Sequence, residues 1–157
     1  MARVLAENLD GSSLSVAVIA ARFNTLVTER LLAGALEGLA ERGVQPERTL
    51  VVWVPGAFEL AFAARRLAEN GRHDAIVCLG CVIKGETDHD RYISEQAARG
   101  IAAVGEETGV PAIFGVLTPN SLEQALARAE EGPTNKGYEA ALAAVVMANL
   151  RRALGEG

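Results

Sequence analysis

The alternation of short apolar runs with segments of helical periodicity constrains the fold of this chain more than any other feature of its sequence. The apolar runs cover residues 13–20, 48–54, 74–80 and 111–118. Their apolar residues are consecutive rather than alternating, which is typical of strands that are covered on both faces. Strands of this kind, separated by helices, predict a parallel sheet with right-handed crossovers and helices on both sides.

The segments with helical spacing cover residues 24–43, 57–71, 89–108, 121–131 and 136–154. Gly43 and Gly71 end the first two segments as C-cap signals, and Ser121 with Gln124 forms a capping box. The expected fold class is therefore α/β: a three-layer αβα sandwich with a four-stranded parallel sheet, of flavodoxin-like architecture. The short segment 2–7, ARVLAE, is a candidate for an extra N-terminal edge strand, on this sheet or on that of a neighbouring chain.

Length and composition narrow the class of protein. The chain has 157 residues, which suits one domain over 1–157, and only 4% are aromatic, so its core is expected to consist of Ala, Val, Leu and Ile. No apolar run approaches the ~18 residues of a membrane span, and the N-terminus lacks the apolar stretch of a signal peptide. We therefore expect a cytoplasmic protein. The net charge of -5 and the lack of a basic patch argue against nucleic acid as a partner.

Cys78 and Cys81 form the sequence CLGC, which raises the question of redox or zinc chemistry. Residues three apart on a strand point to opposite faces, so a disulfide is not expected here. There is no second cysteine pair for zinc, no dinucleotide fingerprint and no G-x-S-x-G motif. We therefore predict two reduced cysteines beside a strand, and no metal or cofactor.

The loops after the four predicted strands contain most of the residues that could bind a ligand or take part in catalysis. In an open parallel sheet, ligands bind beyond the carboxyl ends of the strands. The segments expected at that edge are ARFN (21–24), VPGAFE (54–59), GCVIKGETDH (80–89) and LTPNS (117–121). The sequence therefore places a ligand site at this edge.

The stretch GCVIKGETDH resembles a phosphate-binding P-loop but departs from it, because Glu86 occupies the position of the lysine. A smaller anion site remains consistent with the sequence. Gly85 lets the backbone approach a ligand, and the N–H groups of Glu86 and Thr87 are expected at the start of the third helix. His89 follows within one turn and is a candidate acid/base. The other histidine, His73, lies in a polar turn and is expected to be solvated.

Two residues of the neighbouring loops allow alternative interpretations. Phe23 could stack on a flat ring, or it could cap the core. Glu59 could interact favourably with the dipole of the second helix, or it could accept hydrogen bonds from ligand hydroxyls. Together the residues indicate an α/β enzyme or binder whose small phosphorylated ligand meets an aromatic ring and a histidine.

Five motifs in this order resemble the 6,7-dimethyl-8-ribityllumazine synthase family, from about residue 15 to about residue 150. They are RFN (22–24), PGAFEL (55–60), CVIKGETDH (81–89), FGVLT (114–118) and NKGYEAA (135–141). The resemblance implies condensation of 5-amino-6-(D-ribitylamino)uracil with 3,4-dihydroxy-2-butanone 4-phosphate, with loss of phosphate and water. This is the penultimate step of riboflavin biosynthesis, and it implies two small-molecule substrates, one of them phosphorylated, and no cofactor.

The resemblance also implies roles for individual residues. Phe23 would stack on the pyrimidine, Ala57 and Phe58 would line the ribityl chain, and Glu59 would bind its hydroxyls. The backbone of Cys81, Val82 and Ile83 would read the polar edge of the pyrimidine. Glu86 and Thr87 would hold the phosphate and His89 would move protons. Phe114 would close the pocket and Arg128 would pair with the phosphate, with Lys136 as a further helper.

The family further implies a homo-oligomer with interfacial active sites: a pentamer, with an icosahedral shell and an enclosed riboflavin synthase as further options. A helix rise of 1.5 Å per residue puts Arg128 roughly 10 Å from the ligand edge of its own chain, so we expect a neighbouring subunit to deliver it. The chain departs from the family at Asp90, where an aromatic is usual, at Ala61, where many members have proline, and at Glu130, where glycine is common.

Two other functions fit the same fold. A non-catalytic flavin or nucleotide-binding module would explain Phe23 and the anion loop, but not His89 together with Arg128. A shell-forming scaffold could assemble with or without activity.

Overall fold

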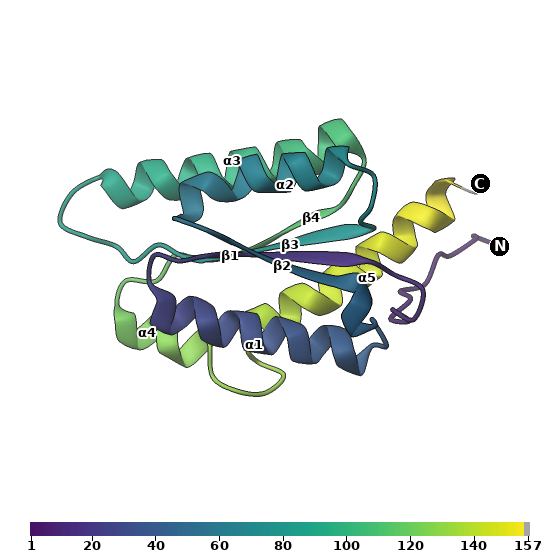
Figure 1. Cartoon of the computed structure of the whole chain (residues 1–157), viewed down its shortest axis with the longest axis horizontal. Helices are drawn as coiled ribbons and strands as arrows, with labels where there is room; N and C mark the ends of the chain where they lie inside the picture. Colours follow the sequence, from purple (N-terminus) through teal and green to yellow (C-terminus); the bar gives the residue numbers. More distant parts are fainter. Residues whose placement is uncertain (156–157) are drawn as a thin grey trace.

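The structure, a computed structural model that describes residues 1–155, is built on a sheet of four parallel strands (Figure 1). In spatial order the strands are β2 (Thr49–Val54), β1 (Val16–Ala21), β3 (Ala75–Cys81) and β4 (Ala112–Leu117). Every residue of β1 and β3 is buried, whereas β2 is mostly half-buried because it lies at an edge. The predicted four-stranded parallel sheet is confirmed.

Helices cover both faces of the sheet, which confirms the three-layer sandwich. Figure 1 shows α2 (Leu60–Glu69) and α3 (His89–Thr108) on one side, and α1 (Thr25–Glu41), α4 (Leu122–Arg128) and α5 (Lys136–Gly155) on the other. The core correspondingly forms two clusters, one on each face of the sheet, and both are built chiefly from Val, Leu, Ile and Ala. Within residues 1–155, no helix combines the length and apolar character that crossing a membrane requires.

The two cysteines of β3 are free and buried, as expected. Cys78 packs in the cluster under α2 and α3, and Cys81 packs in the cluster under α1 and α5. Burial raises the pKa of the Cys78 thiol to about 12 and that of the Cys81 thiol to about 11. Both thiols are therefore unreactive at neutral pH, since the thiolate is the nucleophile.

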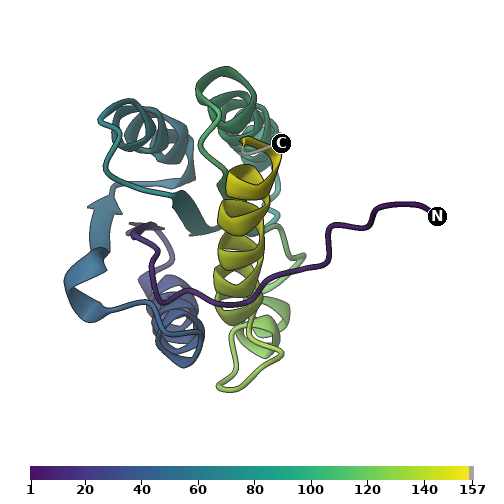
Figure 2. The same ribbon diagram turned by 90° about the vertical axis from the view of Figure 1, so that its right-hand side faces the viewer.

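Two sequence-based expectations need correction. Residues 2–7 form no strand and do not join the sheet of their own chain, and Figure 2 shows the N-terminal segment crossing α5 and projecting beyond it. Pairing of this segment with the sheet of a neighbouring chain stays a prediction. The side chain of Asn149 on α5 donates hydrogen bonds to the carbonyls of Asn8 and Asp10, which directs this segment along the helix rather than along a sheet edge. Helix α4 is also shorter than expected and ends at Arg128, not near residue 131.

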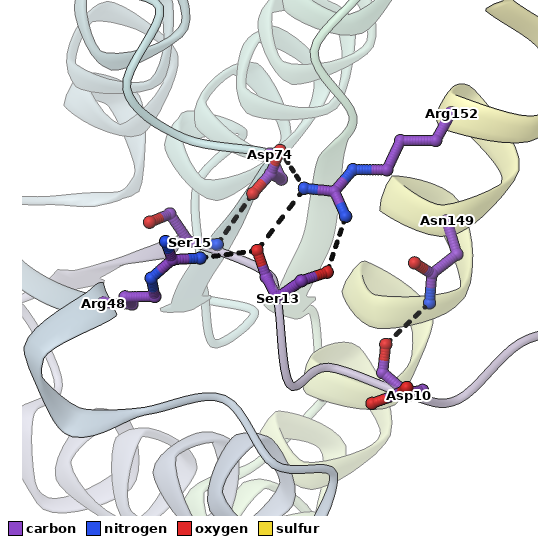
Figure 3. Close-up of polar contacts among 7 residues, drawn as sticks. All are labelled: Asp10, Ser13, Ser15, Arg48, Asp74, Asn149 and Arg152. Atoms are coloured by element: carbon purple, nitrogen blue, oxygen red, sulfur yellow. Dashed lines mark hydrogen bonds and ion pairs between the residues drawn. The ribbon is translucent and has the colours of Figure 1, made fainter. Parts of the chain in front are cut away.

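A polar network closes the amino edge of the sheet (Figure 3). The carboxylate of Asp74 accepts the backbone N–H of Ser15 at 2.7 Å and pairs with Arg152 of α5 at 3.2 Å. The backbone carbonyl of Ser13 accepts from Arg48 at 2.6 Å, and the Ser13 hydroxyl accepts from Arg152 at 2.7 Å. These bonds fix the chain ahead of β1 to the end of α5, while the opposite edge of the sheet stays open.

Candidate functional site

A cavity of about 690 Å³ lies at the carboxyl edge of the sheet, within the volume range typical of small-molecule sites. The ends of β1 and β3 form its floor, and the starts of α2 and α3 form its far side. We call it the first cavity. Eight side chains expected from the sequence line it together: Phe23, Ala57, Phe58, Glu59, Cys81, Val82, Ile83 and His89.

Phe23 enters the first cavity from the end of β1. Its backbone N–H donates to the carbonyl of Pro55 at 2.9 Å, which fixes the backbone beside the second loop. Its side chain is 71% exposed, so the ring does not cap the core. The structure therefore excludes the core-capping interpretation and leaves the ring free to stack on a planar ligand.

Glu59 belongs to a short 3-10 turn, Ala57–Glu59, that leads into α2. It occupies the N-cap position of α2, yet its side chain makes no capping hydrogen bond. The carboxylate lies at the wall of the first cavity instead. Its position is therefore compatible with acceptance of hydrogen bonds from ligand hydroxyls.

In the segment after β3, the backbone N–H and C=O groups of successive residues point alternately toward β4 and toward the cavity. The N–H of Val82 donates to Leu117 at 2.8 Å and that of Lys84 donates to Pro119 at 3.0 Å, both toward the β4 side. The carbonyl of Cys81 accepts from the Asn24 side chain at 2.7 Å, on the β1 side. In extended chain, the N–H and C=O of one residue share a side and the next residue faces the other way. Ile83 therefore offers a donor and an acceptor to the β1 side, where the cavity lies.

The anion loop differs from the sequence-based expectation. Helix α3 begins at His89 with Asp88 as N-cap, so Glu86 and Thr87 lie three and two residues before the helix, and both are exposed outside the first cavity. The N–H of Gly85 donates to the carboxylate of Asp90 at 3.3 Å, and the N–H of His89 donates to the Thr87 hydroxyl at 3.4 Å. The loop is thus held by local contacts next to the cavity.

The two histidines have different surroundings. His89 is exposed and lines the first cavity from the first turn of α3. His73, expected to be solvated, is half-buried: its Nδ1 has no hydrogen-bond partner among residues 1–155, and burial lowers its pKa. Its turn follows α2 and lies at the amino edge of the sheet, so His89 is the histidine placed to meet a ligand.

A second cavity of about 450 Å³ lies along the β4 edge, against α4 and α5. It contains Phe114, Arg128 and Lys136, and the ammonium of Lys136 pairs with Glu139 at 2.9 Å. Its lining residues are different from those of the first cavity. The chain therefore does not bring Phe114 and Arg128 to its own His89, which agrees with the distance expected for Arg128 from the helix rise.

Sequence reasoning missed several residues of the first cavity. Three of them lie on α3 at helical spacing from His89, so the i+3, i+4 and i+7 positions could have identified them: Tyr92, Ile93 and Gln96. Asp90 also lines the cavity, and so does Asn24, which belongs to the segment ARFN expected at this edge but received no role. Asn24 could not have been found by periodicity, because its contact with Cys81 joins two distant loops.

A comparison with family models gives one match that spans almost the whole chain. The model described as 6,7-dimethyl-8-ribityllumazine synthase matches residues 13–152. The matched region includes every residue named above at either cavity.

Proposed function

The chain belongs to the 6,7-dimethyl-8-ribityllumazine synthase family, and we propose that it condenses 5-amino-6-(D-ribitylamino)uracil with 3,4-dihydroxy-2-butanone 4-phosphate to form 6,7-dimethyl-8-ribityllumazine. Membership makes it an enzyme of riboflavin biosynthesis, a transferase in general terms. The observation that carries the specific proposal is that an aromatic ring, a backbone donor–acceptor pair and a histidine converge on the first cavity.

The pyrimidine binds between β1 and the segment after β3. Phe23 stacks on the face of the pyrimidine ring. The Phe23 ring is accessible for this contact because its side chain is 71% exposed. Ile83 pairs its N–H and C=O with the imide edge of the ring, whose acceptor and donor are complementary. Val82 and Cys81 line the site but do not recognise the ring, since the Val82 N–H and the Cys81 carbonyl already have hydrogen-bond partners. Glu59 accepts from the ribityl hydroxyls, and Ala57 and Phe58 line that chain.

The phosphate of the second substrate binds at the loop before α3. The backbone N–H groups of Glu86 and Thr87 hold it, because Gly85 leaves the approach open: a side-chain carbon there would meet no atom within 4 Å. This places the butanone carbonyl beside the pyrimidine amine and near His89. Holding an amine and a ketone together supplies much of the barrier reduction for imine formation.

The reaction then requires only proton movements from this chain. The pyrimidine amine adds to the ketone and water leaves, giving an imine. Loss of a proton next to the imine expels phosphate, and the ribitylamino nitrogen closes the ring with loss of a second water. His89 accepts and returns protons in these steps, as its place on the cavity wall allows.

The site is completed by a neighbouring subunit, so the proposed assembly is a ring, and the family implies that this ring is a homopentamer. Phe114 and Arg128 line the second cavity, away from the His89 of their own chain. Within residues 1–155, those that line the first cavity include no lysine or arginine that could pair with the phosphate. An Arg–phosphate pair is charge-assisted and strong. A contact between the first cavity of one chain and the second cavity of the next is head-to-tail, and such contacts close into rings.

The test is to incubate the purified protein with both substrates and follow the fluorescence of the lumazine product. Fluorescence should rise faster than in a protein-free mixture, and one phosphate should appear per product formed. Product formation no faster than without protein would contradict the proposal. In that case, riboflavin binding would identify a flavin-binding module, and large particles in light scattering would identify a scaffold.

A further inference from the structure

Asn24, at the junction of β1 and α1, has a backbone conformation that needs an explanation. Its φ and ψ are 62° and 47°, in the left-handed region, and among residues 1–155 no other non-glycine residue has a positive φ. Most side chains destabilise this conformation, whereas asparagine adopts it more readily. The residue directly follows Phe23 and lines the first cavity.

The side chain of Asn24 makes an unusual contact for its position. Asparagine at the N-cap of a helix normally accepts a backbone N–H of the first turn, but Asn24 makes no such bond. Its backbone carbonyl accepts from Val27 and Thr28, and its side-chain Nδ2 donates to the carbonyl of Cys81 at 2.7 Å. The amide thus links the end of β1 to the end of β3, across the floor of the cavity.

The two linked segments carry the two groups proposed to bind the pyrimidine. Phe23 precedes Asn24 by one residue, and Ile83 follows Cys81 by two. We propose that Asn24 is a positioning residue for pyrimidine recognition: its left-handed backbone directs Phe23 into the cavity, and its amide fixes the distance between that ring and the Ile83 backbone pair. The inference rests on the proposed function, because it takes the bound ring to be the pyrimidine.

Three substitutions separate the backbone contribution from that of the amide. Asn24→Gly retains the left-handed conformation and removes the amide. Asn24→Asp retains tolerance of that conformation but replaces the donor with a carboxylate that faces the Cys81 carbonyl. Asn24→Ala removes both features. Asn70→Gly is the matched control: Asn70 follows α2, away from both cavities, and its side chain accepts the N–H of Arg72 at 3.0 Å.

Two measurements report on the site. Fluorescence titration gives the dissociation constant of the lumazine product without turnover, and steady-state kinetics give KM for each substrate separately. One lost hydrogen bond predicts a rise of roughly three- to tenfold in the lumazine dissociation constant and the pyrimidine KM for Asn24→Gly and Asn24→Asp. Asn24→Ala should give a larger rise. KM for the butanone phosphate should stay within about twofold of wild type, as should every constant of Asn70→Gly.

The results distinguish this inference from the function on which it rests. Wild-type protein that neither binds the lumazine nor forms it would overturn the proposed function and the inference with it. Active wild-type protein with unchanged lumazine binding in Asn24→Gly and Asn24→Asp would overturn the inference alone. Equal increases in both KM values would also overturn it, since they would indicate general loosening of the fold and not loss of pyrimidine positioning. If one variant does not fold, the other retains the test.

Discussion

Replacing Phe23 with alanine should weaken pyrimidine binding while leaving the fold intact. The side chain is 71% exposed in the single chain, so its removal takes little apolar surface out of the core. The stacking it offers a planar base is typically worth about 1 to 3 kcal/mol, which corresponds to a roughly 5- to 150-fold rise in the dissociation constant. The turnover at saturating pyrimidine should fall much less, because His89 is untouched.

The matched control for this variant is Phe62→Ala. Phe62 lies on α2, is 73% exposed, and lies outside both cavities. Both variants and the wild type would be titrated with the lumazine product, and their melting temperatures and particle masses compared. Lumazine affinity within about twofold of wild type in Phe23→Ala, with unchanged mass, would refute the stacking role. Equal losses in both variants would refute its specificity.

His89→Ala should fold normally and slow turnover by less than the ~10² to 10⁴ usual for a lost acid/base, and wild-type-like turnover from about pH 6 to about pH 8 would remove His89 from the mechanism. Inorganic phosphate should compete with the butanone phosphate and not with the pyrimidine. Asp90→Asn should strengthen that inhibition about two- to fivefold, because the carboxylate next to the Gly85 N–H repels phosphate; weaker inhibition would contradict this. Asn135→Ala loses four hydrogen bonds of a buried amide. It should lower the free energy of unfolding by about 2 to 6 kcal/mol, measured in urea at fixed protein concentration, and a loss below about 1 kcal/mol would contradict a stabilising role of these bonds.

The sheet was predictable because its strands are consecutive apolar runs and its turns contain glycine at the helix ends. Burial of a strand on both faces requires consecutive apolar residues, which the sequence shows directly. Successive side chains of a strand point to opposite faces, so the positions of the two cysteines on opposite faces could also be predicted. The position of the ligand edge was predictable too, because parallel strands end together. These features depend on residues close together in the sequence.

The failures depend on contacts that short stretches of sequence do not encode. The segment 2–7 contains apolar residues, but its path depends on Asn149 at the other end of the chain. The predicted bounds of the third helix, 89–108, agree with α3. Glu86 and Thr87 were expected at the start of this helix, but the polar residues before His89 do not show which of them begins it, and both lie outside it in the structure. The role of Asn24 depends on a bond to Cys81 and on a left-handed backbone, and neither is visible in periodicity.

The central claim is that each active site combines His89 of one chain with Arg128 of the next. The direct test mixes unfolded Arg128→Ala and His89→Ala subunits in equal amounts and refolds them together. In a randomly assembled ring, about a quarter of the sites regain both groups. Lumazine formation by the mixture should therefore exceed the average of the two variants refolded separately. Activity equal to that average, with mixed rings confirmed by mass spectrometry, would contradict the account.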